Sequence, residues 1–127
     1  MTDAGLRHLC TLRESLRALE LCSGGVTDAG VAAIAQLTLL ESLNLNQNAR
    51  ITDAAVPALC TLPCLRTLSL SGTHITDAGV LQFAAAPPCL QALAVYRCDV
   101  SALAVDSLQA SRPLLRVTRT EAAGLLL

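Results

Sequence analysis

The sequence predicts an α/β repeat protein, a solenoid built from short helices that alternate with short strands. Two patterns predict this fold. A five-residue phrase that resembles a helix start recurs at nearly constant intervals, and a leucine-rich segment with strand-like alternation lies between successive copies. A repeat of roughly 20 to 50 residues is the signature of a solenoid, in which each unit buries its apolar face against its neighbours.

The helix-start phrase is clearest at Thr76-Asp77-Ala78-Gly79-Val80. Its copies begin near residues 2, 27, 52, 76 and 101, and the last copy is degenerate. The hydroxyl of the leading Thr or Ser can accept a hydrogen bond from the first helical turn. The Asp that follows places negative charge at the positive end of the helix dipole. The third helix carries Pro57, which removes a helix hydrogen bond, so we expect it to be irregular or short.

The strand segments have the pattern L-x-x-L-x-L. Four clear copies begin at Leu16, Leu40, Leu65 and Leu90. The L-x-L alternation directs the leucines to one face of a strand and the residues between them to the other. Residues 113–120 continue the pattern in a worn form. We expect them to keep the register, with Thr118 and Thr120 in place of the inner leucines.

These segments, together with Ile75-Thr76-Asp77-Ala78-Gly79-Val80, resemble the cysteine-containing leucine-rich repeat family over roughly residues 1–120. The resemblance implies a leucine-rich repeat solenoid with a parallel β-sheet on its concave face and short helices on its convex face. It also implies a buried residue in the turn after each strand that satisfies backbone groups. These turn residues are Gly24, Asn48, Thr73 and Cys98. The family includes F-box adaptor subunits of ubiquitin ligases, but no segment here resembles an F-box.

Length and composition predict one domain over residues 1–127 with a core of aliphatic side chains, because only 2% of the residues are aromatic. The net charge is −1 and the arginines are dispersed, so there is no basic footprint for nucleic acid. No apolar stretch is long enough to cross a membrane, and no signal peptide is evident. We therefore expect a cytoplasmic protein with no nucleic-acid or membrane partner.

The six cysteines and two histidines do not form a recognisable catalytic or metal-binding pattern. Five cysteines occupy repeat positions that elsewhere hold Ala, Leu or Asn, which predicts small buried hydrophobic side chains. Cys22 is the exception and should point outward. Neither His8 nor His74 has a nucleophile placed beside it by the sequence. We expect a protein that is not an enzyme and that has no metal, cofactor or catalytic residues.

The outward-facing strand residues are the best candidates for binding. They form three rows across the predicted sheet. The first row is Ala18, Ser42, Thr67, Ala92 and Val117; the second is Glu20, Asn44, Ser69, Ala94 and Arg119; the third is Cys22, Asn46, Ser71, Tyr96 and Glu121. Tyr and Arg are the residue types that dominate interfaces, and Tyr96 with Arg97 is the only such pair. The predicted partner-binding residues are Glu20, Cys22, Asn44, Asn46, Ser69, Ser71, Ala94, Tyr96, Arg97 and Arg119.

The main functional hypothesis is a protein–protein interaction scaffold that binds an unidentified protein through its concave strand face. The alternative is a structural segment of a larger receptor or ubiquitin-ligase adaptor whose activity lies outside this chain. Two interpretations of the chain ends also stay open. Thr118 and Thr120 could form a terminal strand that caps the core, or the chain could extend a longer array or associate end to end with another copy.

Overall fold

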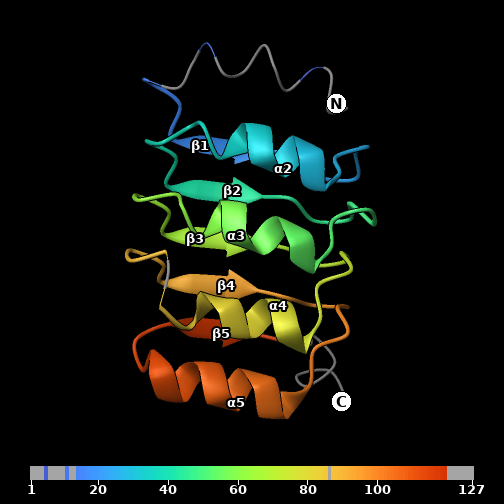
Figure 1. Cartoon of the computed structure of the whole chain (residues 1–127), viewed down its shortest axis with the longest axis vertical. Coiled ribbons are helices and arrows are strands. Elements are labelled where there is room, and N and C mark those ends of the chain that lie inside the picture. The colour runs from blue at the N-terminus through green and yellow to red at the C-terminus, as the bar shows by residue number, and fades with distance from the viewer. Residues whose placement is uncertain (1–4, 6–10, 12–13, 86, 120–127) are drawn as a thin grey trace.

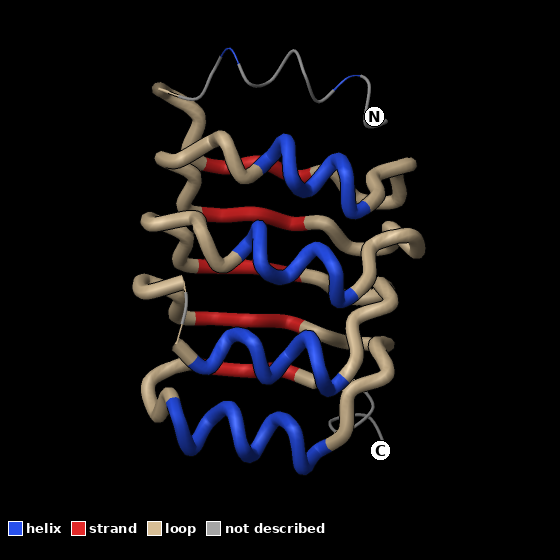
Figure 2. Tube along the Cα trace, in the orientation of Figure 1, coloured by secondary structure: helices blue, strands red, loops and turns tan. Residues whose placement is uncertain are grey.

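The computed structural model describes residues 5, 11, 14–85 and 87–119, which form a single stack of repeats (Figure 1). The strands form one layer, and the helices lie side by side in a second layer against it (Figure 2). Several predicted features lie outside the described residues. They are the first helix-start phrase at residue 2, His8, Cys10, Thr120 and Glu121.

Five short strands form one parallel sheet in sequence order, as predicted. The strands are β1 (Ala18–Glu20), β2 (Ser42–Asn44), β3 (Thr67–Ser69), β4 (Ala92–Ala94) and β5 (Arg116–Thr118). The middle residues of β1 to β4 are leucines, and they pair in register from Leu19 through Leu43 and Leu68 to Leu93. Because the repeats are in register, the residues on either side of these leucines also form continuous rows.

Helical segments connect the strands, and each begins at a copy of the helix-start phrase. They are α2 (Asp28–Ile34), the 3₁₀ turn η2 (Asp53–Ala55) with α3 (Val56–Leu59), α4 (Asp77–Leu81) with the 3₁₀ turn η3 (Gln82–Ala84), and α5 (Ala102–Ser111). The expected caps form at Thr27, Thr52 and Ser101, whose hydroxyls accept first-turn N–H bonds of 3.2 to 3.3 Å. The cap expected at Thr76 does not form, and the Thr76 hydroxyl donates to Asp53. The irregular helix expected at Pro57 is confirmed, because there a 3₁₀ turn precedes a four-residue helix.

The core lies between the two layers and is aliphatic, as the composition predicts. Leu43, Leu68 and Leu93 are each at most 2% exposed, and Phe83 is the one aromatic side chain in this core. Burying each such leucine stabilises the fold by about 1.5–3 kcal/mol relative to exposure. The stack is therefore held together by rows of leucines that each repeat contributes in the same place.

The predicted register of the last strand is wrong by one residue. Arg116 and Thr118 face outward opposite Ala92 and Ala94, while Val117 pairs with Leu93 and packs against the core. Leu115 is buried, so one residue separates the inward-facing Leu115 and Val117. In the other repeats two residues separate the corresponding leucines, as between Leu90 and Leu93. A shift of one residue exchanges the faces of a strand, and this shift turns Val117 toward the core, where it is partly buried, instead of Thr118.

The turn residues that follow the strands satisfy backbone groups, as the resemblance implied. Asn48 is fully buried, and its side chain spans two repeats. Its Nδ2 donates to the carbonyls of Leu21 and Leu45, both at 2.8 Å, and its Oδ1 accepts from the N–H groups of Gly24 at 3.1 Å and Val26 at 3.2 Å. The turn at Gly24, which lacks a side chain of its own, is thus supported by the next repeat.

The Asp of the helix-start phrase has a second role that the sequence did not reveal. Each Asp accepts two hydrogen bonds from the Thr or Ser that opens the following repeat. Asp28 accepts from the N–H and hydroxyl of Thr52 at 2.7 and 2.6 Å. The same pairs join Asp53 to Thr76 and Asp77 to Ser101. We call Asp28, Asp53 and Asp77 the aspartate ladder.

Candidate functional site

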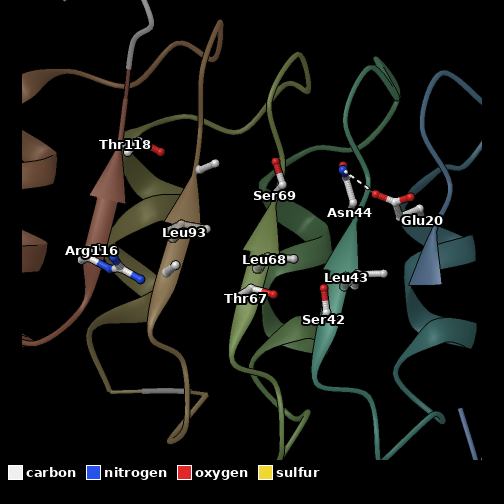
Figure 3. Close-up of a pocket in the computed structure, with 12 residues that line it drawn as sticks. Glu20, Ser42, Leu43, Asn44, Thr67, Leu68, Ser69, Leu93, Arg116 and Thr118 are labelled. Atoms are coloured by element: carbon white, nitrogen blue, oxygen red, sulfur yellow. Dashed lines mark hydrogen bonds between the residues drawn. The ribbon is translucent and has the colours of Figure 1, made fainter. Parts of the chain in front are cut away.

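The outward face of the sheet is concave and forms an open hollow of about 370 Å³ (Figure 3). All five strands contribute to it. Its lining residues are Glu20, Ser42, Leu43, Asn44, Thr67, Leu68, Ser69, Ala92, Leu93, Ala94, Arg116 and Thr118. Leu43, Leu68 and Leu93 are the middle residues of their strands, and their side chains are buried in the core. The strands position the other lining side chains, because parallel pairing in register repeats the same outward positions from one strand to the next.

Short, uncharged side chains make up the middle of this hollow. Ser42 and Thr67 are exposed, and Ser69, Ala92 and Ala94 are half-buried. The backbone groups of β2, β3 and β4 pair with neighbouring strands on both sides, so recognition on this face must come from side chains. The small side chains leave room above the sheet for larger side chains of a binding partner.

The two charged residues of the lining lie at opposite ends of the hollow. Glu20 is on β1 and Arg116 is on β5 (Figure 3). The Glu20 carboxylate accepts one long hydrogen bond, at 3.5 Å, from Asn44 Nδ2. Because both charged side chains are exposed, the hollow presents a negative end and a positive end with a neutral floor between them.

The third row of predicted residues lies where the strands run into their turns, beyond the lining of the hollow. Much of its hydrogen bonding is internal. Asn46 Oδ1 accepts from Ser69 Oγ at 2.6 Å and from the Ser71 N–H at 2.8 Å, while Ser71 Oγ accepts from the Tyr96 N–H at 2.9 Å. Ser71 is only 6% exposed. These side chains tie neighbouring turns together, and they offer less to a partner than the first two rows do.

Tyr96 and Arg97 sit in the turn after β4. Tyr96 is half-buried, and Arg97 is exposed with a left-handed φ of 57°. Ser23, Gln47 and Gly72 hold the same turn position in the other repeats and share the positive φ. The pair therefore lies beside the hollow, at the edge where the strands end.

The structure thus divides the ten predicted binding residues into groups. Glu20, Asn44, Ser69 and Ala94 line the hollow together. Cys22, Asn46, Ser71, Tyr96 and Arg97 lie along its turn edge. Arg119 is not in the second row, because the one-residue shift of β5 moves it past the strand; its Nη1 donates to the Val100 carbonyl at 3.3 Å.

Arg116 and Thr118 are lining residues that the sequence-based prediction missed. The signal that could have found them is the spacing of Leu115 and Val117, the last apolar residues that alternate like the inner leucines. Giving those two residues the inward positions would have placed Arg116 and Thr118 on the outward face. Ser42, Thr67 and Ala92 were assigned to the correct outward row but were not selected as binding residues.

His74 and Cys60, two side chains that could serve in catalysis or metal binding, have partners within the fold. His74 Nδ1 donates to the carbonyl of Ala49. Burial raises the pKa of the Cys60 thiol, although the charge of Arg112 opposes this shift. The Cys60 Sγ lies 3.6 Å from the Gln82 carbonyl oxygen. Among the described residues, no three His, Cys, Asp or Glu side chains cluster as metal ligands would. No helix within the described residues is long and apolar enough to cross a membrane.

The cysteines only partly match the expectation of burial. Cys60, Cys64 and Cys98 are partly buried, whereas Cys89 is exposed. Cys98 Sγ donates to the Leu70 carbonyl at 3.1 Å, so it serves the turn as the resemblance implied. Cys22 is exposed at the turn edge of the sheet, in line with the outward orientation expected from the sequence.

A second hollow of about 510 Å³ lies where the helices return to the strands, between the repeats that contain β4 and β5. Arg112 lines it, but its guanidinium is already engaged. It donates to the carbonyls of Phe83 at 3.0 Å and Pro87 at 2.7 Å. The hollow on the sheet is therefore the stronger candidate for a site.

Comparisons with known proteins agree with this architecture. A family model described as leucine rich repeat matches residues 14–75. None of the curated proteins compared with the chain matches it. A solved structure titled "Leiomodin-1 Actin-Binding Site 2 (ABS2)" is similar over 94% of this chain and 80% of that chain, with a TM-score of 0.70 and 15% sequence identity.

A second solved structure, titled "Structure of Chaetomium Mex67:Mtr2 subunits", is similar over 92% of this chain and 89% of that chain. Its TM-score is 0.67 and its sequence identity is 19%. At such low identity the likeness concerns the fold. The cysteine-containing type of repeat stays a prediction, since the matching family model is the general one. The family match, the parallel sheet and these structures together show that the chain has the α/β fold of a leucine-rich repeat solenoid.

Proposed function

We propose that this chain is a non-enzymatic interaction module that binds a protein partner on the outward face of its sheet. The observation that carries the proposal is the hollow across all five strands, lined by short side chains. The titles of the two similar structures name an actin-binding site and a complex of subunits, which supports a protein as the partner. Repeat solenoids present extended concave surfaces that suit such binding.

The size of the face limits what can bind there. Adjacent strands lie about 4.8 Å apart and residues within a strand about 3.3 Å apart, so the five three-residue strands cover roughly 19 by 10 Å. A stable interface between two globular proteins buries about 800 Å² on each partner. The lined face is several times smaller, so it suits a narrow partner segment, with any further contacts made by the turn edge.

A variant that fills the hollow tests the proposal. Ala94→Tyr places a ring above the floor on a strand, where aromatic residues are well tolerated. A partner captured from cell extract should bind this variant at least tenfold more weakly than the original chain, as measured by calorimetry. The matched control is Ala78→Tyr, at an exposed alanine on α4, which should change the affinity by less than twofold.

Two truncations then locate the contact. Asn44→Ala removes a lining side chain, and Tyr96→Ala removes the aromatic ring at the turn edge. A loss of affinity for Asn44→Ala alone would place the contact in the hollow, and a loss for Tyr96→Ala alone would place it at the edge. Unchanged affinity for both truncations and for Ala94→Tyr would refute binding through this face.

Two further expectations from the sequence remain proposals. A cytoplasmic location is tested by imaging a fluorescently tagged chain in its native cell. End-to-end association of copies is tested by sedimentation velocity over a hundredfold range of concentration. A sedimentation coefficient that stays at the value of a monomer over this range would exclude the association.

A further inference from the structure

The charges of the hollow narrow the chemistry of its occupant, provided that the proposed function holds. Glu20 and Arg116 are its only charged lining residues, and they come from the first and last strands of the described sheet. The lining residues that β2, β3 and β4 contribute between them are uncharged. A ligand that crosses the strands therefore meets a carboxylate at one end and a guanidinium at the other (Figure 3).

Both charges remain available for a ligand. Within the described part of the chain, the Arg116 side chain has no hydrogen bond or ion pair, and Glu20 has only the 3.5 Å contact with Asn44. Two other arginines, Arg17 and Arg119, already have partners. Arg17 forms an ion pair with Glu41 at 2.9 Å, and Arg119 donates to a backbone carbonyl. Arg116 is exposed, and a guanidinium can hold a carboxylate through two parallel hydrogen bonds.

The dimensions favour an extended chain that runs across the strands. The two charged strands are separated by four strand spacings, roughly 19 Å. An extended peptide advances about 3.3 Å per residue, so about six residues cover that distance. The width of the face along the strands, about 10 Å, admits one such chain. The small side chains of Ala92 and Ala94 leave space for the residues in its middle.

We infer that the hollow binds an extended peptide segment with a basic residue near Glu20 and an acidic residue five to seven positions away near Arg116. The intervening residues lie over the neutral floor. Because the face offers side chains and not free backbone groups, the segment can run in either chain direction. The hollow therefore selects a segment by the opposite signs of its two charges and by the spacing between them.

A random dodecapeptide library displayed on phage is the probe, selected against the full chain. The selected peptides should be enriched in one basic and one acidic residue five to seven positions apart. A synthetic peptide from this pool should bind Glu20→Arg or Arg116→Glu at least fivefold more weakly than the original chain in fluorescence anisotropy. The double variant Glu20→Arg with Arg116→Glu exchanges the two charges. It should regain at least half of the affinity, on a logarithmic scale, that the single variants lose, because the peptide can bind it in the opposite chain direction.

The outcomes separate this inference from the proposed function. Peptides that Ala94→Tyr blocks, but that carry no paired charges and bind both charge variants normally, would overturn the inference and leave the proposed function standing. Peptides that bind Ala94→Tyr as tightly as the original chain would contradict the use of this face altogether. A library that yields no binding peptide would also overturn the inference. Circular dichroism of each variant confirms that the fold is kept.

Discussion

Polar residues of the same types serve two different purposes in this molecule. Along the starts of the helices, the aspartate ladder joins each repeat to the next through two hydrogen bonds per junction. On the strand face, residues such as Ser42 and Thr67 line an open hollow and face solvent. The first set holds repeats together, and the second is exposed to whatever approaches the sheet.

The two sets of polar residues differ in whether the same residue type recurs at the same position of each repeat. Each junction of the ladder needs an Asp in one repeat and a Thr or Ser in the next. The chain has the Asp at Asp28, Asp53 and Asp77, and a Thr or Ser begins the repeat that follows each of them. The outward strand rows change from one repeat to the next, for example from Glu20 to Asn44, Ser69 and Ala94. A polar residue that recurs with the period is therefore explained by contacts between repeats, and one that varies is a better candidate for recognition.

The largest effect is expected at the turn asparagine. Asn48→Ala leaves buried and partly buried donors and acceptors of two turns without partners, and each unsatisfied buried group costs about 1–3 kcal/mol. We expect a loss of about 3–4 kcal/mol in the free energy of unfolding, measured by urea denaturation. Asn44→Ala, the matched change on the strand face, should cost less than about 1 kcal/mol because Asn44 is partly exposed. Equal costs would erase the distinction between the two regions.

The aspartate ladder should be the next most sensitive. Asp53→Ala removes the acceptor for the N–H and hydroxyl of Thr76, both partly buried, with an expected loss of about 1–3 kcal/mol. Asp106→Ala, an exposed position in α5 outside the ladder, should change stability by no more than about 0.5 kcal/mol. Gly79 belongs to the same junction, since a Cβ there would clash with Asp53 Oδ1.

Acid should weaken the junction of the ladder that Asp77 forms with Ser101. The Ser101 N–H and then the Ser101 hydroxyl hold the pKa of Asp77 below its usual value. A carboxyl with a lowered pKa in the folded state stabilises the protein above its unfolded pKa of about 3.9, and this contribution is lost as the pH falls below that value. The stability difference between the original chain and Asp77→Asn should therefore shrink from pH 6 to pH 3.

Urea midpoints at the two pH values measure this change. Ser101→Ala serves as the control, because it removes the hydroxyl donor and keeps the N–H, so its difference from the original chain should also shrink, but by less. A difference for Asp77→Asn that is the same at both pH values would show that the negative charge of Asp77 does not contribute to folding.

The smallest effect on stability is expected at the turn edge. Arg97→Gly relieves a left-handed φ that glycine adopts readily, as Gly72 does in the preceding repeat. The free energy of unfolding should change by less than about 1 kcal/mol, since relief of the backbone offsets the added freedom of the unfolded chain. If Arg97 contacts the partner, calorimetry should show weaker binding at nearly unchanged stability, which would extend the recognition surface from the hollow to the turns.

The sequence by itself determined the repeat, the parallel sheet and the first two outward rows of the first four strands. It could do so because the fixed period and the two-residue alternation of a strand are visible in the order of the residues, and each repeat has the same pattern as its neighbours. The irregular third helix was predictable for the same reason, since Pro57 acts on its own turn.

Only the tertiary structure decided the features that depend on contacts between repeats. The aspartate ladder joins side chains 23 or 24 positions apart, so one copy of the phrase gives no sign of it. The register of the final strand is shifted by one residue, so that Val117 packs against the core beside Leu93. That shift, which depends on packing against the preceding strand, placed Arg116 in the hollow and Arg119 outside it.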